Sequence, residues 1–283
     1  MTTVGVLHPG AMGAVVASLL EQPVLWAGAG RSTSTARRAG DAGLVDVGTV
    51  EDLGHRADVV VAVCPPESAE VVADQVASTG FTGLYVDANA ISPATARRVA
   101  DRFERFVDGG IVGPPPTGPG TTRLYLSGNE APAVAALFDG THLEARVVDG
   151  PAGAASAVKM GFAAWTKGTS ALLVAIRAMA RAEDVEADLL AEWATSRPDL
   201  VERSGAVVGQ VGPKAWRFEA EMREIAATFE SDGLPPGFHL AAAEVYRRLA
   251  PLKDTTGPTL EEALDLLARP STAGGQRSGQ TGK

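Results

Sequence analysis

Hydrophobic and polar positions divide the chain into two parts with different periods. Up to about residue 150, short runs of β-branched and other apolar residues alternate with longer alanine-rich stretches. Such runs, bounded by turn residues, predict the buried strands of a parallel sheet, and the stretches between them predict covering helices. The predicted strands are 4–7, 24–26, 59–63, 84–87, 106–108, 124–127 and 145–148, and the predicted helices include 34–42, 68–77, 93–102 and 131–138. We therefore expect a doubly wound α/β domain.

The period changes at a turn-rich joint, residues 150–153, after which no strand pattern remains. Apolar residues from Val158 to Met179 recur at helical spacing and predict one long helix over 154–181. Further helices are predicted at 187–194, 198–203, 213–231, 238–250 and 259–268. We expect a sheet domain over 1–150, an all-α domain over 151–269, and a disordered tail over 270–283, which is rich in Gly, Ser and Thr.

The first strand runs into the sequence HPGAMG, which is similar to a dinucleotide-binding fingerprint. Gly10 and Gly13 stand where the second and third glycines of that fingerprint lie, and His8 replaces the first. Gly10 would let the backbone approach a pyrophosphate, and Gly13 would let the following helix pack closely on the strand. A tight turn without a ligand is the alternative. The predicted phosphate loop comprises Pro9, Gly10, Ala11, Met12 and Gly13.

The segment after the second strand indicates which nucleotide this loop would hold. A chain that binds NAD usually places Asp or Glu there for the ribose 2′-hydroxyl, but this chain has Arg31 and Ser32. The planar guanidinium of Arg31 suits a 2′-phosphate. Alternatively, Arg31 is a solvated loop residue. Together with the fingerprint, the pair predicts NADP (NADPH) as the cofactor.

Two further strand ends should meet at the same edge of the sheet, because ligands of such sheets gather at the carboxyl ends of the strands. One runs into Cys64 and Pro65, and the next reaches Asn89. The Asn89 amide both donates and accepts, so it could bind the nicotinamide ribose or a substrate oxygen; the alternative is a turn or cap residue. No basic partner stands near Cys64 in the sequence, which favours a lining residue over a nucleophile.

Lys159 lies in the first turns of the long helix, among small and apolar residues. Desolvation at that position would lower the pKa of its ammonium toward the range of an acid–base catalyst. The alternative is a surface lysine whose stem packs on the helix. Lys167, two turns later, is the reserve candidate. Glu221 and Glu224 are three residues apart and either project together into a cleft or form a solvated face, and His239 is expected to be structural.

Composition and charge narrow the class of protein. The chain has 283 residues, of which 45% are hydrophobic, and a formal net charge of −9 with a pI near 5.0. The acidic balance argues against a nucleic-acid partner, which needs a basic face. One cysteine leaves no internal disulfide and argues against zinc, so we expect no metal and a cytoplasmic location. No apolar run reaches the length of a membrane span, so no membrane partner is expected.

Five motifs together resemble the 6-phosphogluconate dehydrogenase-like superfamily, which includes the β-hydroxyacid dehydrogenases and the imine reductases. They are HPGAMG, the GRS after the second strand, DANAISP, the DGGIVGPPP loop and GPAGAASAVKM. The helical half resembles the poorly characterised branch with phosphogluconate-dehydrogenase-like C-terminal domains. The resemblance implies an N-terminal Rossmann domain, a long interdomain helix, and an all-α domain that forms a homodimer with shared active sites.

The same resemblance implies roles for particular residues. The loop from Pro9 to Gly13 would hold the pyrophosphate, Arg31 and Ser32 the 2′-phosphate, and Asn89 the nicotinamide side. Lys159 matches the catalytic lysine of the family. Predicted cofactor contacts also include Cys64 and Pro65, and predicted substrate contacts are Asn89, Val112, Gly113 and Glu221.

Departures from the family pattern bear on the substrate. Val112 stands where β-hydroxyacid dehydrogenases usually have serine, and Ala163 stands where they have asparagine. Phe162 and Thr166 replace a histidine and a glutamate of phosphogluconate dehydrogenases, which argues against a sugar phosphate. Imine reductases usually lack the lysine that this chain has as Lys159.

These features predict an NADP-dependent dehydrogenase or reductase that moves a hydride between NADPH and a carbonyl or alcohol carbon, with Lys159 as the general acid–base. One alternative is an imine reductase, which would act on C=N bonds. A second, from another class, is a non-catalytic protein that binds or senses NADPH.

Overall fold

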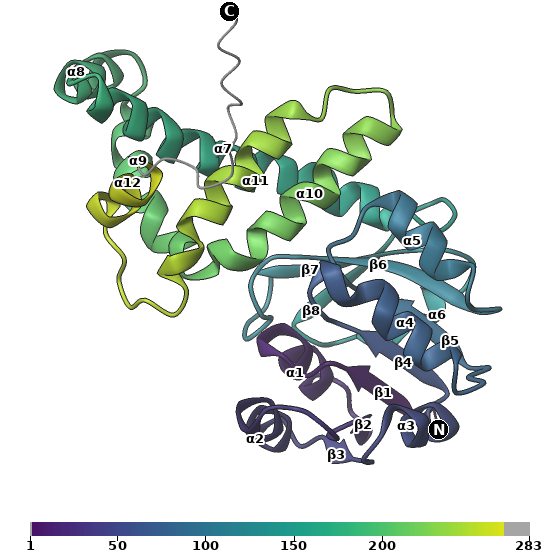
Figure 1. The fold of residues 1–283 in the computed structure, drawn as a ribbon. Helices are drawn as coiled ribbons and strands as arrows, with labels where there is room; N and C mark the ends of the chain where they lie inside the picture. The colour runs from purple at the N-terminus through teal and green to yellow at the C-terminus, as the bar shows by residue number, and fades with distance from the viewer. Residues whose placement is uncertain (1, 269–283) are drawn as a thin grey trace, which may run out of the picture. The chain divides into compact units, whose positions relative to one another are not determined.

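The computed structural model describes residues 2–268. Its first part is built on a single eight-stranded sheet in the order β3-β2-β1-β4-β5-β6-β7-β8 (Figure 1). The strands are β1 (Val4–Leu7), β2 (Val24–Trp26), β3 (Val45–Asp46), β4 (Val59–Ala62), β5 (Leu84–Asp87), β6 (Phe106–Val112), β7 (Thr122–Ser127) and β8 (Leu143–Val147). The order 3-2-1-4-5-6 is that of a doubly wound Rossmann sheet, as the sequence predicts.

Strands β4, β7 and β8 differ from the expected strands by one or two residues at their ends, and two further differences are larger. The two-residue edge strand β3 has no expected counterpart, because it is too short to show a period. Strand β6 extends from the expected 106–108 to Val112 and pairs antiparallel with β7, while every other pair is parallel. The glycines at positions 109 and 110 concealed the continuation of β6, since glycine is not a strand former.

Helices cover both faces of the sheet, and each face has its own apolar core. One core joins α1 (Ala11–Ser18) and α6 (Ala131–Ala136) to the sheet, and the other joins α3 (Val50–Arg56), α4 (Ala69–Ala77) and α5 (Pro93–Ala100). Strand β4 shows the division: Val59 and Val61 face the first core, and Val60 and Ala62 face the second. This alternation follows from the two-residue period of a strand.

Hydroxyl side chains begin several of these helices. Ser32 caps α2 (Thr33–Asp41) by accepting the Thr35 N–H, and Ser92 caps α5 in the same way through Thr95. Thr49 and Asp52 form a reciprocal capping box at the start of α3. Such caps satisfy backbone donors that have no partner inside the helix, so they fix where each helix begins.

From residue 151 to 268 the chain forms helices and no strand. The α-helices are α7 (Ala154–Ala182), α8 (Glu186–Ser196), α9 (Pro198–Val211), α10 (Ala215–Ser231), α11 (Gly237–Leu249) and α12 (Leu260–Ala268). Short 3-10 turns occur at η1 (Pro66–Ser68) in the sheet part, and at η2 (Gly212–Lys214) and η3 (Ala250–Leu252) here. The long helix expected over 154–181 is α7, and α9 is longer than the expected 198–203. No helix among residues 2–268 could span a membrane.

The chain forms two compact units. The first contains residues up to Trp165 together with Ala220–His239, and the second contains Thr166–Glu219 and the described residues from Leu240 onward. The first turns of α7 and most of α10 therefore belong to the unit that holds the sheet, although the sequence suggests an all-α domain from residue 151. The tail expected to be disordered, 270–283, lies outside the described residues.

Candidate functional site

The loop between β1 and α1 has the backbone geometry that a phosphate loop requires. Gly10 is the N-cap of α1, and no side chain caps this helix. A Cβ at Gly13 would lie 2.5 Å from the carbonyl oxygen of His8, whereas one at Gly10 would meet nothing closer than 4.0 Å. Gly13 is thus needed for the close approach of helix and strand, and Gly10 leaves the loop open on its outer side. The first-turn N–H groups of α1 remain available to an anion.

His8, which replaces the first glycine of the fingerprint, forms part of the wall beside this loop. Burial, with a contribution from the charge of Arg31, lowers the pKa of its imidazole to about 4. The ring is therefore neutral at neutral pH. Its Nδ1 is buried and has no hydrogen-bond partner among the described residues.

A hollow of about 340 Å³ opens at the carboxyl ends of β1 and β4, which are neighbours in the sheet. Its size is within the range of small-molecule sites. The hollow brings together the phosphate loop, the loop after β2, the loop after β4 and helix α4. Its lining residues are His8, Gly10, Arg31, Thr35, Val63, Cys64, Pro65, Ser68, Val71, Val72 and Gln75.

A second hollow, of about 510 Å³, shares Arg31 and Gln75 with the first. It continues toward α3 and the end of α4, and its other lining residues are Ala29, Val50, Glu51, Ser78 and Thr79. Arg31 thus lies where the two hollows meet. A ligand longer than the first hollow could extend into the second past the Arg31 side chain.

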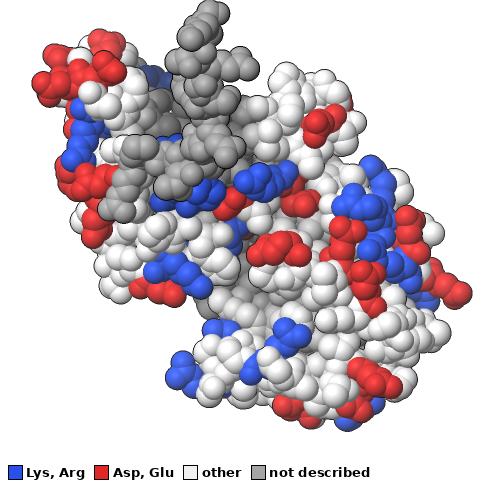
Figure 2. Space-filling model, in the orientation of Figure 1, with Lys and Arg blue, Asp and Glu red and all other residues white. Residues whose placement is uncertain are grey.

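Arginine side chains without carboxylate partners lie near the phosphate loop. Within residues 2–268 the exposed guanidinium of Arg31 makes no hydrogen bond or ion pair, while Ser32 is occupied as the cap of α2. Arg38, which the sequence analysis missed, donates from Nη1 to the carbonyl oxygen of Pro9 at 3.4 Å. It is seven residues after Arg31, and that two-turn spacing is the signal that could have found it. Figure 2 shows basic side chains gathered in the region of α1 and α2.

The structure also places a carboxylate after β2 that the local sequence does not show. Asp46 of β3 accepts the N–H of Gly28 at 3.0 Å and that of Gly48 at 2.8 Å through the same oxygen. A Cβ at Gly28 would collide with this carboxylate. Asp46 therefore fixes the conformation of the turn after β2. It lies 18 residues after Gly28, and the pairing of β2 with β3 brings the two together.

Asn89 and Cys64 are joined by a hydrogen bond between two strand ends. The Asn89 Oδ1 accepts the backbone N–H of Cys64 at 2.6 Å, and its Nδ2 donates to Asp87 at 2.9 Å. Asn89 is 3% exposed and does not line the hollow. Burial, together with the nearby charge of Asp87, raises the pKa of the Cys64 thiol to about 12, so the thiol stays protonated and is a poor nucleophile.

Lys159 is held on β6 by a buried anchor at the start of α7. The Asp108 carboxylate accepts the N–H groups of Gly153 and Ser156, each at 2.9 Å, and the hydroxyls of Ser156 and Ser127 at 2.6 and 3.0 Å. These bonds satisfy the first turn of the helix from inside the sheet. One turn further on, the half-buried Lys159 Nζ donates to the carbonyl oxygen of Ile111 at 2.6 Å.

The other candidates from the sequence have different surroundings. Val112 is buried in β6, and Gly113 has a positive φ of 124° in the turn that follows. Glu221 is 8% exposed and lies in the unit that holds the sheet. Lys167 lies in the other unit, where its Nζ is 4.9 Å from the centre of the Phe218 ring.

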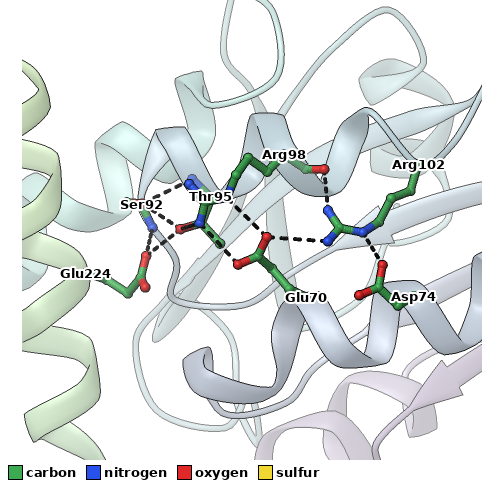
Figure 3. A network of polar contacts seen from close by, with 7 residues as sticks. All are labelled: Glu70, Asp74, Ser92, Thr95, Arg98, Arg102 and Glu224. Atoms are coloured by element: carbon green, nitrogen blue, oxygen red, sulfur yellow. Dashed lines mark hydrogen bonds and ion pairs between the residues drawn. The ribbon is translucent and has the colours of Figure 1, made fainter.

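Glu224 supports the Ser92 cap of helix α5. Its carboxylate accepts the Ser92 N–H at 2.6 Å and the Thr95 hydroxyl at 3.0 Å, as Figure 3 shows. Through Thr95 the contacts continue to Arg98, which forms a two-bond ion pair with Glu70 of α4. Glu224 therefore neither points into a cleft with Glu221 nor lies on a solvated face, but joins α10 to the capped start of α5 and, through Thr95 and Arg98, to α4.

His239 packs its ring against Phe229 at 4.2 Å between ring centres. Burial lowers the pKa of this imidazole. Within residues 2–268 its buried Nδ1 has no hydrogen-bond partner, in keeping with a structural residue.

Comparison with known proteins places this arrangement among dehydrogenase folds. Residues 180–249 match a family described as "Domain of unknown function (DUF1932)". The conserved protein MTH1747 of unknown function, whose structure is similar to 3-hydroxyacid dehydrogenases, is 28% identical with a TM-score of 0.64, over 88% of this chain and 98% of that one. No match was found among curated proteins.

Two more distant structures share the fold. The 3-hydroxyisobutyrate dehydrogenase of Mycobacterium tuberculosis, solved with L-serine, is 16% identical with a TM-score of 0.69, over 95% of this chain and all (100%) of that one. An imine reductase from Myxococcus stipitatus in complex with NADP+ is 19% identical with a TM-score of 0.53, over 94% and 99%. The resemblance to hydroxyacid dehydrogenases and imine reductases is thereby confirmed at the level of the fold.

Proposed function

We propose that this protein is an NADP-dependent oxidoreductase that moves a hydride between NADPH and a carbonyl or alcohol carbon of a small molecule. The observation that carries the proposal is that the open glycine loop after β1 and the unpaired Arg31 line the same hollow. The hollow lies at the carboxyl ends of neighbouring parallel strands, which is where such sheets bind nucleotides.

The residues present fit a phosphorylated dinucleotide. Gly10 leaves room for a pyrophosphate, α1 offers its free N–H groups, and Arg31 and Arg38 supply positive charge in a chain that is acidic overall. The neutral His8 adds no charge to the wall. When bound, the nicotinamide supplies the hydride chemistry, so the protein has to bind, orient and manage one proton.

We assign the transfer of that proton to the side chain of Lys159. A hydride added to a carbonyl carbon leaves negative charge on the oxygen, and an ammonium can neutralise it by donating a proton. In the reverse direction the neutral amine would accept the proton of the alcohol. Its hydrogen bond to the Ile111 carbonyl and the Asp108 anchor of α7 give the side chain a fixed origin, which is what acid–base catalysis requires.

Reduction of C=N bonds is the second candidate. The fold shared with the imine reductase from Myxococcus stipitatus supports it, as do the apolar residues Val112 and Ala163 at positions where hydroxyacid dehydrogenases have polar side chains. Turnover with cyclic imines, or with ketone and amine together, and none with ketones or hydroxy acids alone would favour this candidate. Tight NADPH binding without turnover of any carbonyl or imine would favour a sensing role.

Two variants test the assignment. Arg31→Ala should weaken NADPH binding by tenfold or more, about 1.4 kcal/mol, and change NADH binding little, because only NADPH carries the 2′-phosphate. Arg56→Ala, an exposed arginine that lines neither hollow, is the matched control. Lys159→Ala should lower turnover by about two to four decades and leave NADPH affinity within a few-fold. Equal losses for the two cofactors, or full turnover without Lys159, would refute the respective role.

We further propose a homodimer formed through the helical part. Helix α7 exposes large apolar side chains, among them Leu172 at 43% and Met179 at 53%, and an exposed apolar patch of this kind commonly marks a protein–protein interface. Light scattering should give the mass of two chains, and Met179→Glu should shift the mass toward one. A monomer at micromolar concentration would contradict the proposal.

A further inference from the structure

Asn89 and Asp87 form a chain of hydrogen bonds that ends at the wall of the cofactor hollow. The Asp87 carboxylate accepts both the backbone N–H of Asn89 and its Nδ2–H, each at 2.9 Å. The Oδ1 of the same amide accepts the N–H of Cys64 at 2.6 Å. Cys64 and Pro65 line the hollow, whereas Asp87 and Asn89 do not.

Burial makes this chain a part of the protein interior. Asp87 is fully buried (0% exposed) and Asn89 is 3% exposed, so water does not compete for the hydrogen-bonding groups of either side chain. The two residues belong to β5 and the loop after it, and Cys64 belongs to the loop after β4. The Asn89 side chain is therefore the polar link between two loops that the sheet alone does not hold together at this point.

The carboxylate of Asp87 decides which way the Asn89 amide points. An ionised carboxylate only accepts, so above pH 7 Asp87 selects the NH2 end of the amide and leaves the carbonyl oxygen for the Cys64 N–H. With the amide reversed, two acceptors would face each other at Asp87 and two donors at Cys64. Both contacts would be lost in the interior, where unsatisfied polar groups are costly.

We propose that Asn89 is a positioning residue, which holds the Cys64–Pro65 wall of the cofactor hollow in place through the Cys64 N–H, and that Asp87 fixes the orientation of its amide. The proposal rests on the proposed function for the identity of the ligand, and it replaces the direct contact to nicotinamide expected from the sequence. Asn89 then affects cofactor affinity without touching the cofactor.

An exchange of the two side chains separates positioning from direct contact. Asp87→Asn alone sets two NH2 groups against each other, and Asn89→Asp alone sets two carboxylates against each other. In the double variant the amide at position 87 accepts the N–H of residue 89 and donates to the new carboxylate. That carboxylate still accepts the Cys64 N–H, so every bond of the chain is restored, but position 89 has lost its donor for a ligand.

The first measurement is NADPH affinity by calorimetry at pH 8.5, where the Asp87 carboxyl, whose pKa is about 7, is mainly ionised. Each single variant should weaken binding by fivefold or more, on the scale of one lost buried hydrogen bond, and the double variant should return to within about threefold of the parent. Asp101→Asn with Asn129→Asp, both at exposed positions, makes the same exchange as a control and should leave affinity unchanged. A double variant as weak as Asn89→Asp would overturn the proposal, because a directly contacting amide is not replaced by a carboxylate. Single variants that bind like the parent would overturn it as well.

The second measurement is hydrogen exchange at the Cys64 amide without any cofactor. This N–H should exchange slowly in the parent and in the double variant, and faster in both single variants that remain folded by circular dichroism. Equal exchange in all four proteins would refute the positioning role even if NADPH binds. Protected exchange together with no NADPH binding by the parent would instead refute the proposed function, so the two failures are distinguishable.

Discussion

Asp87 should make the stability of this protein depend on pH in an unusual direction. Burial, with added repulsion from Asp108 and Glu224, raises the pKa of the Asp87 carboxyl from 3.8 to about 7. The folded protein therefore binds a proton between about pH 4 and pH 7 that the unfolded chain has already released. By linkage, the free energy of unfolding must fall as the pH rises through that window.

The size of the effect follows from the pKa difference. Three pKa units correspond to roughly 4 kcal/mol in full, since one unit is about 1.4 kcal/mol. Between pH 5 and pH 8 the part that remains is about 2 to 3 kcal/mol, because some of the change lies below pH 5. In Asp87→Asn this contribution disappears, while the opposite contribution of His8, whose pKa is lowered to about 4, is present in both proteins and cancels in their difference.

Urea unfolding followed by circular dichroism at pH 5, 6, 7 and 8 measures that difference. Relative to the parent, Asp87→Asn should gain about 2 to 3 kcal/mol from pH 5 to pH 8, whatever the absolute cost of its lost hydrogen bond. Asp101→Asn, at an exposed position, should run parallel to the parent at all four pH values. If Asp87→Asn also runs parallel, Asp87 is ionised across the whole range and the reasoning from burial is wrong.

Two glycine substitutions test the close contacts behind the candidate site. Gly13→Ala places a Cβ 2.5 Å from the His8 carbonyl oxygen, which cannot move freely, so we expect a loss of about 1 to 3 kcal/mol in urea unfolding together with weaker NADPH binding. The control Gly40→Ala, in a helix with nothing within 4 Å of the new Cβ, should be neutral or stabilising. Gly110→Ala would bring a Cβ to 2.8 Å from that of Lys159; turnover should fall by about tenfold to a hundredfold with NADPH affinity kept, and unchanged turnover would show that the Lys159 position is uncritical.

The sequence predicted the elements whose signal is local. Strand β4 shows in its letters as an unbroken apolar run, because a central parallel strand is buried on both faces. Gly13 could be assigned its role because close packing on the preceding strand leaves no room for a side chain, and the distance to His8 bears this out. The long helix α7 followed from an apolar period that no glycine or proline interrupts decisively.

Features that depend on a partner from a distant segment could not be predicted. Asn89 presents the same letters whether it touches a ligand or the Cys64 N–H, and only the adjacency of β4 and β5 brings that N–H within reach. Asp108 was expected to lead into a glycine loop, but its carboxylate starts α7, 45 residues or more further along the chain. Glu224 accepts the N–H of Ser92, the cap of α5, across 132 residues. In each case the polar residue is visible in the sequence, but its hydrogen-bond partner is determined by the tertiary fold.

Direct binding of NADPH and NADH to the purified protein tests the central claim most simply. Calorimetric titration at neutral pH should give saturable binding of NADPH, at least tenfold tighter than that of NADH, because the glycine loop takes the pyrophosphate and Arg31 reads the 2′-phosphate. Absence of binding by either nucleotide would mean that His8 closes the phosphate loop, and it would contradict the assignment of an NADP-dependent oxidoreductase.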